Sequence, residues 1–180
     1  MKTQGGYTLT ELLVVSAIVA ILLGIGVPSY RYLTTNYRMS AEINALLGDL
    51  QFARYEAIKE GQPVTVCSSS DGATCSGNNT WQAGWVIFSN PLVAAQPPLN
   101  SVLRVQRGFT GTTPDTFATN PAVSSISYNR EGFANTGAGF PQATMTLTES
   151  TNNVAYQRCL FITPQGVPST ATHAISPGLC

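Results

Sequence analysis

The distribution of hydrophobic and polar residues divides the chain into three stretches. The first is an apolar run from Leu12 to Val27, interrupted only by Ser16 and by small residues. At about 16 to 20 residues, it is just long enough for a helix to cross a bilayer core of about 30 Å. The positive-inside rule keeps Lys2 on the cytoplasmic side. We therefore predict a single membrane-spanning segment, placed at residues 7–28, with the remainder exported.

The second stretch, Ser29 to Glu60, is amphipathic. Its apolar positions recur at intervals of three and four, as on one face of a helix; they are Leu33, Tyr37, Ile43, Leu46, Leu47, Leu50, Ala53 and Ala57. Gly61 and Pro63 are typical of a helix end. A helix over residues 7–60 would be about 80 Å long, and we expect its distal stripe to dock on a folded domain.

Other residues of this helix lie off the stripe or interrupt it. Charged residues such as Asp49 and Arg54 fall mostly outside the apolar face and are expected in solvent. Pro28, with Gly24 and Gly26 just before it, predicts a kink or a locally unwound stretch, because proline has no amide for the helical hydrogen bond.

The third stretch, residues 61–180, has the clusters of β-branched and aromatic residues typical of strands, separated by turn residues. The candidate strands are Val64 to Cys67, Gly84 to Phe88, Val102 to Arg107, Ser125 to Tyr128, Ala143 to Thr148 and Ala155 to Thr163. Asn90 to Ser101 and Phe109 to Val123 are expected to be irregular and exposed. The fold class is α+β, a long N-terminal helix packed on one small antiparallel β-domain.

Composition narrows the class of protein. Apolar residues make up 43% of the 180-residue chain and charged residues 10%, which excludes a disordered polyampholyte. The formal net charge is zero, so the overall charge does not attract the chain to nucleic acid or to anionic lipid.

The four cysteines form two local sets, Cys67 with Cys75 and Cys159 with Cys180, and neither set has CxxC spacing. Three pairings are possible, and pairing within each set is the one we expect in an exported chain. The loop-entropy model gives the two bridges roughly 2.5 and 3.5 kcal/mol of stabilisation. Reduced thiols in a cytosolic protein are the alternative, against which the export signal argues.

Three interpretations of the N-terminus compete: a secretory signal peptide, a plain membrane anchor and a prepilin signal. The carboxylate of Glu11, at the start of the apolar run, and helical character past Gly24–Gly26 both argue against a secretory signal. The segment Gly5-Gly6-Tyr7-Thr8-Leu9-Thr10-Glu11 resembles the prepilin peptidase site of type IV pilins and type II secretion pseudopilins. The family usually has Phe at the position of Tyr7 and an aliphatic residue at that of Thr10.

This resemblance implies roles for four residues. Prepilin peptidase would remove the leader, residues 1–6, by cutting after Gly6, and Tyr7 would become the N-methylated first residue. Glu11 matches the glutamate that directs filament assembly, and Pro28 matches the helix-kinking proline. The fold implied is the type IV pilin fold, with two disulfides in this chain.

Two stretches of the β-domain resemble the GspH/FimT group of minor pilins and pseudopilins. The first runs from Val64 to Gly72, with Cys75, and continues through Trp81 to Gly84-Trp85-Val86-Ile87-Phe88. The second is Ile126 to Phe133. The resemblance covers most of the chain and is looser in the loops.

The sequence offers little for catalysis. The only histidine, His173, has no second candidate ligand nearby and is interpreted as a surface or capping residue. The acids of the β-domain are isolated from one another in sequence, so no carboxylate pair or calcium loop is visible. We expect a non-enzymatic protein with no metal and no cofactor.

DNA binding is an alternative, because FimT-like members can receive DNA through a Gly-Arg-x-Arg motif near the C-terminus. The corresponding positions here read Gly166-Val167-Pro168-Ser169, without either arginine. Arg104 and Arg107 could still form a patch with Arg158 across strands, as weak DNA contacts. Phosphate-driven affinity grows with each cation in the interface, so DNA contact is not the favoured function.

The sequence thus predicts a minor pilin that takes part in type IV pilus biogenesis. The alternatives are a GspH-like pseudopilin of type II secretion and a FimT-like DNA receptor for natural transformation. The expected partners are prepilin peptidase, inner-membrane lipid and other pilins or pseudopilins packed against the N-terminal helix. The expected location is the bacterial inner membrane, as a single-pass protein with its β-domain in the periplasm, and then the pilus or pseudopilus.

Overall fold

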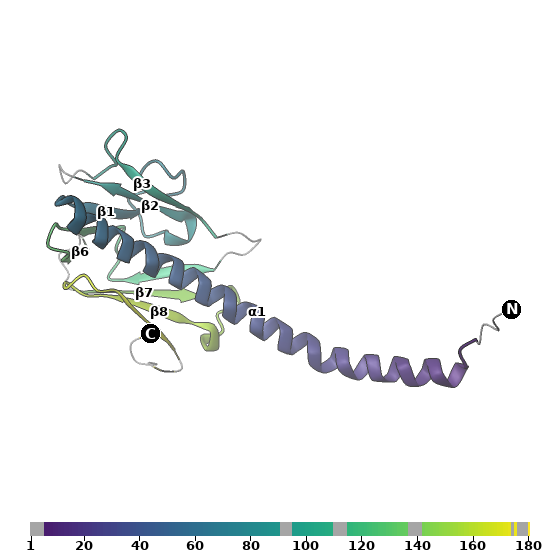
Figure 1. Cartoon of the computed structure of the whole chain (residues 1–180). Helices are drawn as coiled ribbons and strands as arrows, with labels where there is room; N and C mark the ends of the chain where they lie inside the picture. The colour runs from purple at the N-terminus through teal and green to yellow at the C-terminus, as the bar shows by residue number, and fades with distance from the viewer. Residues whose placement is uncertain (1–5, 91–94, 110–114, 137–141, 174, 176–179) are drawn as a thin grey trace. The chain divides into compact units, whose positions relative to one another are not determined.

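The structure is a computed structural model that describes residues 6–90, 95–109, 115–136, 142–173, 175 and 180. It divides into two compact units, Met1–Arg38 and Met39–Cys180. One helix, α1 (Leu9–Glu60), contributes residues to both units (Figure 1).

Local chemistry sets both ends of α1. The helix begins two residues later than predicted, because the hydroxyl oxygen of Thr8 accepts a hydrogen bond from the Glu11 amide (3.3 Å) and so caps the first turn. It ends at Glu60, and Gly61 follows with φ of 65°. That left-handed conformation is readily adopted by glycine and stops a helix, as the sequence predicted.

The described residues of the second unit form nine strands and two short 3-10 helices. The strands are β1 (Val64–Ser68), β2 (Gly84–Ser89), β3 (Val102–Arg107), β4 (Thr116–Asn120), β5 (Ser125–Tyr128), β6 (Ala134–Asn135), β7 (Ala143–Thr148), β8 (Arg158–Ile162) and β9 (Ser169–Thr172). The 3-10 helices are η1 (Trp81–Ala83) and η2 (Val154–Tyr156).

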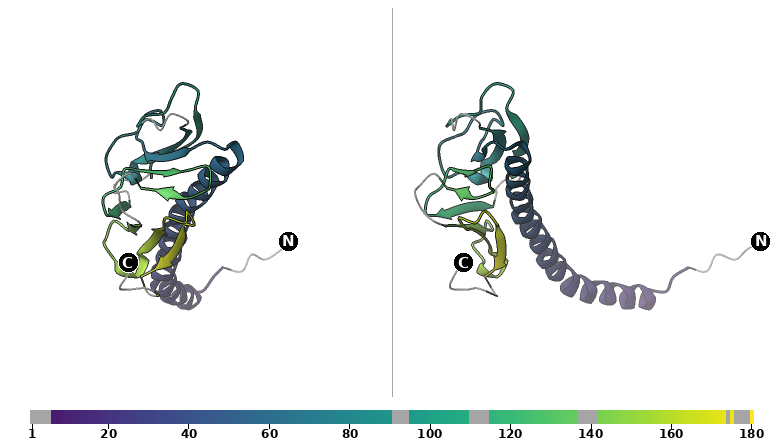
Figure 2. Two further views of the ribbon diagram at one scale, coloured as in Figure 1. Left: turned by 90° about the vertical axis from the view of Figure 1, so that its left-hand side faces the viewer. Right: turned by 60° about the vertical axis from the view of Figure 1, so that its left-hand side comes forward.

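The strands form two antiparallel sheets. One sheet has five strands in the order β3-β2-β1-β5-β6, and the other has four in the order β4-β7-β8-β9. In the first, β1 is central, with Val66 opposite Ile87 of β2 and Ile126 of β5. Figure 2 shows both sheets on the same side of the distal part of α1.

The core lies between this part of α1 and the two sheets. Six helix residues at intervals of three and four are buried: Met39, Ile43, Leu46, Leu50, Ala53 and Ala57. They join one hydrophobic cluster with residues of the five-stranded sheet, such as Trp85 and Ile126, and of the four-stranded sheet, such as Met145 and Leu160. Both sheets therefore depend on the same helix face for burial, which is how the predicted α+β fold is built.

Three sequence predictions for the β-domain were wrong in detail. Ala155 to Thr163 is not one strand, because η2 takes residues 154–156 and β8 begins at Arg158. Phe109 to Val123 is not simply irregular, since it contains β4, whose Phe117 is buried in the core; residues 110–114 lie outside the described chain. The expected exposed loop from Asn90 to Ser101 has buried ends, and its residues 91–94 are also outside the described chain.

The proximal end of the predicted helix stripe also differs from the structure. Tyr37 is 72% exposed and Leu33 47% exposed, whereas Met39, which the stripe omitted, is fully buried. Within the second unit, then, the buried helix face begins at Met39 and not at Leu33.

Candidate functional site

The first unit contains an apolar helical segment whose side chains are exposed. Its large hydrophobic side chains from Leu9 to Val27 are between 43% and 77% exposed. An 18-residue window of α1 reaches a mean hydropathy of 2.5, and none of that window is buried. By length and composition, this helix can cross a membrane. A surface so apolar needs lipid or other apolar helices around it.

Glu11 is the acidic residue in the first turn of this segment. Its backbone amide is capped by Thr8, and the Leu12 amide donates to the Thr8 carbonyl oxygen (3.2 Å). An acid in the first helical turn interacts favourably with the positive end of the helix dipole. Thr8-Leu9-Thr10-Glu11 has the Thr-x-x-Glu spacing of a capping box, a signal that our sequence reasoning overlooked.

Pro28 lies within α1, and the helix continues on both sides of it. Because proline has no amide, the carbonyl of Gly24 lacks its usual helical donor at this point. The kink itself remains a prediction.

Asp49 is the largest departure from the predicted solvated face of α1. Its side chain is only 7% exposed and accepts hydrogen bonds from the indole Nε1 of Trp85 (2.8 Å) and from Nη1 of Arg104 (2.7 Å). The guanidinium of Arg104 also lies 4.3 Å from the ring centre of Phe52, in a cation–π contact. This acid therefore joins α1 to β2 and β3 from inside the fold.

The three arginines considered for a DNA patch lie in two different sheets. Arg104 is paired with Asp49, and β3, which carries it together with Arg107, belongs to a different sheet from β8, which carries Arg158. Nη1 of Arg158 donates to the carbonyl oxygens of Tyr156 and Gln157 (3.2 and 3.1 Å). The three arginines therefore do not lie on strands of one sheet, and a DNA contact by them stays a prediction.

The remaining candidate for side-chain chemistry, His173, is half-buried, and its backbone amide donates to the Gln157 carbonyl oxygen (3.3 Å). Over the described residues, no three His, Cys, Asp or Glu side chains gather as a metal ion would require.

The β-domain carries two disulfides, Cys67–Cys75 and Cys159–Cys180, which are the local pairs that the sequence favoured. The first closes a loop of residues 68–74 beside β1, and we call it the disulfide loop. The side-chain amide of Gln96 binds both backbone groups of Cys75: Oε1 accepts from the amide (2.8 Å), and Nε2 donates to the carbonyl oxygen (3.1 Å). A segment remote in sequence is thereby fastened to this loop.

Asp71 organises the disulfide loop. Its carboxylate accepts hydrogen bonds from the Thr74 hydroxyl (2.7 Å), the amides of Thr74 and Ala73 (both 2.8 Å) and the Ser69 hydroxyl (2.9 Å). These bonds, led by that from the Thr74 hydroxyl, hold the pKa of Asp71 well below its ordinary value of 3.8. The contribution of the ionised Asp71 carboxylate to the stability of the fold is therefore fully present above pH 3.8. It is lost as the pH falls toward the lowered pKa.

We expect Asp71 to titrate below pH 3.8, as followed by the chemical shift of its carboxyl carbon in the full chain in detergent micelles. Thr74→Val removes one donor and should move the midpoint back toward 3.8. A midpoint at the ordinary value in the unaltered chain would contradict the hydrogen-bonded turn.

Comparison with known proteins supplies the family. The family model described as "Type II transport protein GspH" matches residues 42–166, more than half of the chain, and the prokaryotic N-terminal methylation motif matches residues 1–27. The fold is similar to two crystal forms of the type IV minor pilin FimU from Pseudomonas aeruginosa (strain PAO1). In one, the TM-score is 0.62 and the match covers 82% of this chain; in the other, the values are 0.58 and 78%.

Both forms share 19% sequence identity with this chain, which covers 98% of each FimU chain. At that identity, the likeness establishes the type IV pilin fold and not the activity. The family and the fold are those of structural pilin subunits, and the exposed apolar helix with its methylation motif is consistent with inner-membrane anchoring and pilus assembly. The chain therefore belongs to the GspH family of type IV pilin-like proteins and carries the prokaryotic N-terminal methylation motif.

Proposed function

We propose that the chain is a non-enzymatic minor pilin that takes part in the assembly of a type IV pilus. One observation carries the proposal: an apolar helical segment, exposed from Leu9 to Val27, has a single acid, Glu11, in its first turn. The match to the methylation motif and the FimU-like fold support it. A subunit of this kind leaves lipid by packing its apolar segment against the helices of neighbouring subunits.

Processing follows from the same segment. Prepilin peptidase cuts between Gly6 and Tyr7, and the new amine of Tyr7 is methylated. That amine lies four residues before Glu11 and hence on the same side of a helix. A carboxylate in low dielectric is stable only beside a well-placed partner. The ammonium group of this chain or of a neighbouring subunit provides such a partner, so Glu11 fixes the register of the packed helices.

The orientation follows from the charge on the leader. Lys2 stays on the cytoplasmic side, the span crosses the inner membrane once, and the β-domain is placed in the periplasm before it enters the filament. The two disulfides fit that oxidising compartment.

We expect Glu11→Ala to reduce incorporation into filaments about tenfold or more, because an unpaired ammonium and a lost register both disfavour packing in low dielectric. The measurement is the ratio of the chain in sheared filaments to the chain in inner membranes, by immunoblot. Thr10→Ala, in the same exposed turn, is the matched control and should leave the ratio unchanged.

Membrane levels must be equal for the comparison to count, since the proposal assigns Glu11 to assembly and not to anchoring. Unchanged incorporation of the Glu11→Ala variant at a normal membrane level would refute the role. Mass spectrometry of membrane-extracted chain should also show a methylated Tyr7 at the N-terminus; an intact Met1 would refute the processing.

A pseudopilin of type II secretion is the second candidate, and the description of the matching family favours it. Both machines use the same helix chemistry and differ in the partner subunits. Crosslinking followed by identification of the co-purified filament components separates the two: pilins support the pilus, and pseudopilins of the secretion system support the alternative. DNA reception has weaker support, because Arg104 is already committed to Asp49.

A further inference from the structure

Strand β3 is an open edge of the five-stranded sheet. In the described part of the chain it pairs only with β2, so its outer row of backbone donors and acceptors faces no other strand. Its apolar side chains are also accessible: Val102, Leu103 and Val105 are 40%, 43% and 44% exposed. An accessible apolar edge is a template on which another strand can add.

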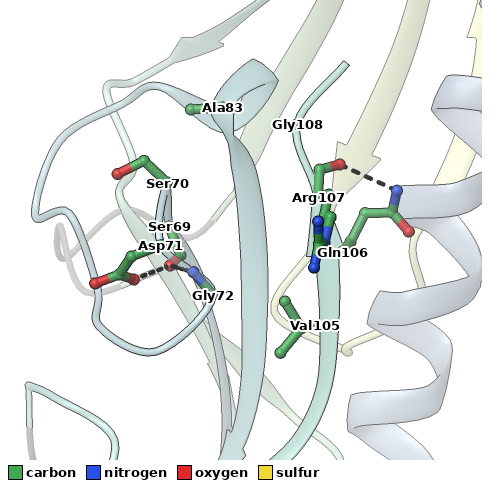
Figure 3. A pocket seen from close by; sticks show the side chains of 9 residues that line it. All are labelled: Ser69, Ser70, Asp71, Gly72, Ala83, Val105, Gln106, Arg107 and Gly108. Carbon is green, nitrogen blue, oxygen red and sulfur yellow. Dashed lines mark hydrogen bonds between the residues drawn. The ribbon is translucent and has the colours of Figure 1, made fainter. Parts of the chain in front are cut away.

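A cleft of about 600 Å³ adjoins this edge. Figure 3 shows residues 69–72 of the disulfide loop on one side of the cleft and residues 105–108, which are the end of β3 and the glycine after it, on the other. The disulfide loop lies close against β3: a Cβ added to Gly72 would lie 2.7 Å from Cγ1 of Val105. The hydrogen bonds of Asp71 hold that wall in shape.

The cleft is lined by one cation, Arg107, and by one carboxylate, Asp71. The exposed guanidinium of Arg107 has no carboxylate partner among the described residues, whereas Arg104 and Arg130 are paired with Asp49 and Glu131. The carboxylate of Asp71 in the opposite wall already accepts four hydrogen bonds from its own turn. Arg107 is therefore the group in this cleft that is left to bind an anion.

We propose that an extended segment of a different protein adds to β3 as a sixth strand and places an acidic side chain against Arg107. Strand addition takes affinity from main-chain hydrogen bonds and specificity from side-chain pockets beside the edge. A second copy of this chain does not fit, because none of its nine described strands contains Asp or Glu.

The test uses the full chain in detergent micelles and two capped peptides of alternating threonine and valine, one with a central glutamate and one with a central lysine. Binding is followed through the NMR shifts of the β3 amides. We expect the glutamate peptide to bind roughly fivefold more tightly, because opposite charges across strands attract and like charges repel. Arg107→Glu should reverse the preference, and Arg130→Glu, which changes an exposed arginine elsewhere, should not.

Peptides with N-methylated backbone amides distinguish the addition of a strand to β3 from simple electrostatic attraction to Arg107. The glutamate peptide is also made with alternate amides N-methylated, in the two possible registers, and one register should lose binding because its donors face β3. Equal binding of all peptides, loss in neither register, or no shift of β3 amides at millimolar peptide would each overturn the proposal.

Discussion

Replacing Asp49 with alanine is expected to lower the free energy of unfolding of the β-domain by about 2–4 kcal/mol. The substitution leaves the indole N–H of Trp85 buried without an acceptor, which costs about 1–3 kcal/mol, and removes the partner of Arg104. The guanidinium is half exposed, so water replaces part of the lost ion pair, and the cost stays below that of a fully buried pair.

Denaturant titration of the full chain in detergent micelles measures this effect, with fluorescence of the buried Trp81 and Trp85 as the signal. Glu60→Ala is the matched control, because this helix acid is 47% exposed and should change stability by less than about 0.5 kcal/mol. Asp49→Asn keeps an oxygen for the indole and should fall between the two. An Asp49→Ala chain as stable as the Glu60→Ala chain would show that the buried acid contributes nothing.

The second large effect is expected at Gly84, where alanine should destabilise the domain by about 3–5 kcal/mol. Gly84 opens β2 with φ of 114°, a conformation that side chains strongly disfavour. A Cβ there would lie 2.5 Å from the Gln106 carbonyl oxygen, 2.9 Å from the Gly108 nitrogen and 3.0 Å from the Ser69 carbonyl oxygen. All three are backbone atoms, so relief requires the strands to move apart.

Gly48→Ala is the control for this prediction, because it should raise the stability that Gly84→Ala lowers. Gly48 lies in α1 with nothing within 4 Å of an added Cβ, and alanine there should stabilise the helix by about 1 kcal/mol. The same denaturation assay compares the two. If Gly84→Ala were tolerated as well as Gly48→Ala, the close approach of the three backbone segments would not limit stability.

Periodicity and local motifs predicted much of the molecule. The intervals of three and four from Ile43 to Ala57 placed the buried helix face, because only one side of a surface helix can meet a core. The Gly61 stop and the two local cysteine pairs rest on equally local rules, and the structure agrees with both. Interactions between neighbouring residues can be read without knowing the topology.

The features that could not be predicted from the sequence depend on contacts between residues that are distant in the chain. Asp49 reads as a solvated acid until Trp85 and Arg104 are brought to it by the sheet. Strands β4 and β9 lie in stretches rich in threonine and serine and become strands only through pairing with β7 and β8. The sequence likewise could not show that Arg104 and Arg107 lie in one sheet and Arg158 in the other, since sheet membership is not local information.

The two-point attachment of Gln96 to Cys75 couples segments that are 21 residues apart. A reducing agent that opens the Cys67–Cys75 ring acts directly on the disulfide loop alone, but the freed Cys75 can then withdraw both of its backbone groups from Gln96. The attachment of Gln96, in a stretch that contains no cysteine, is therefore expected to loosen when this sulfur pair is reduced.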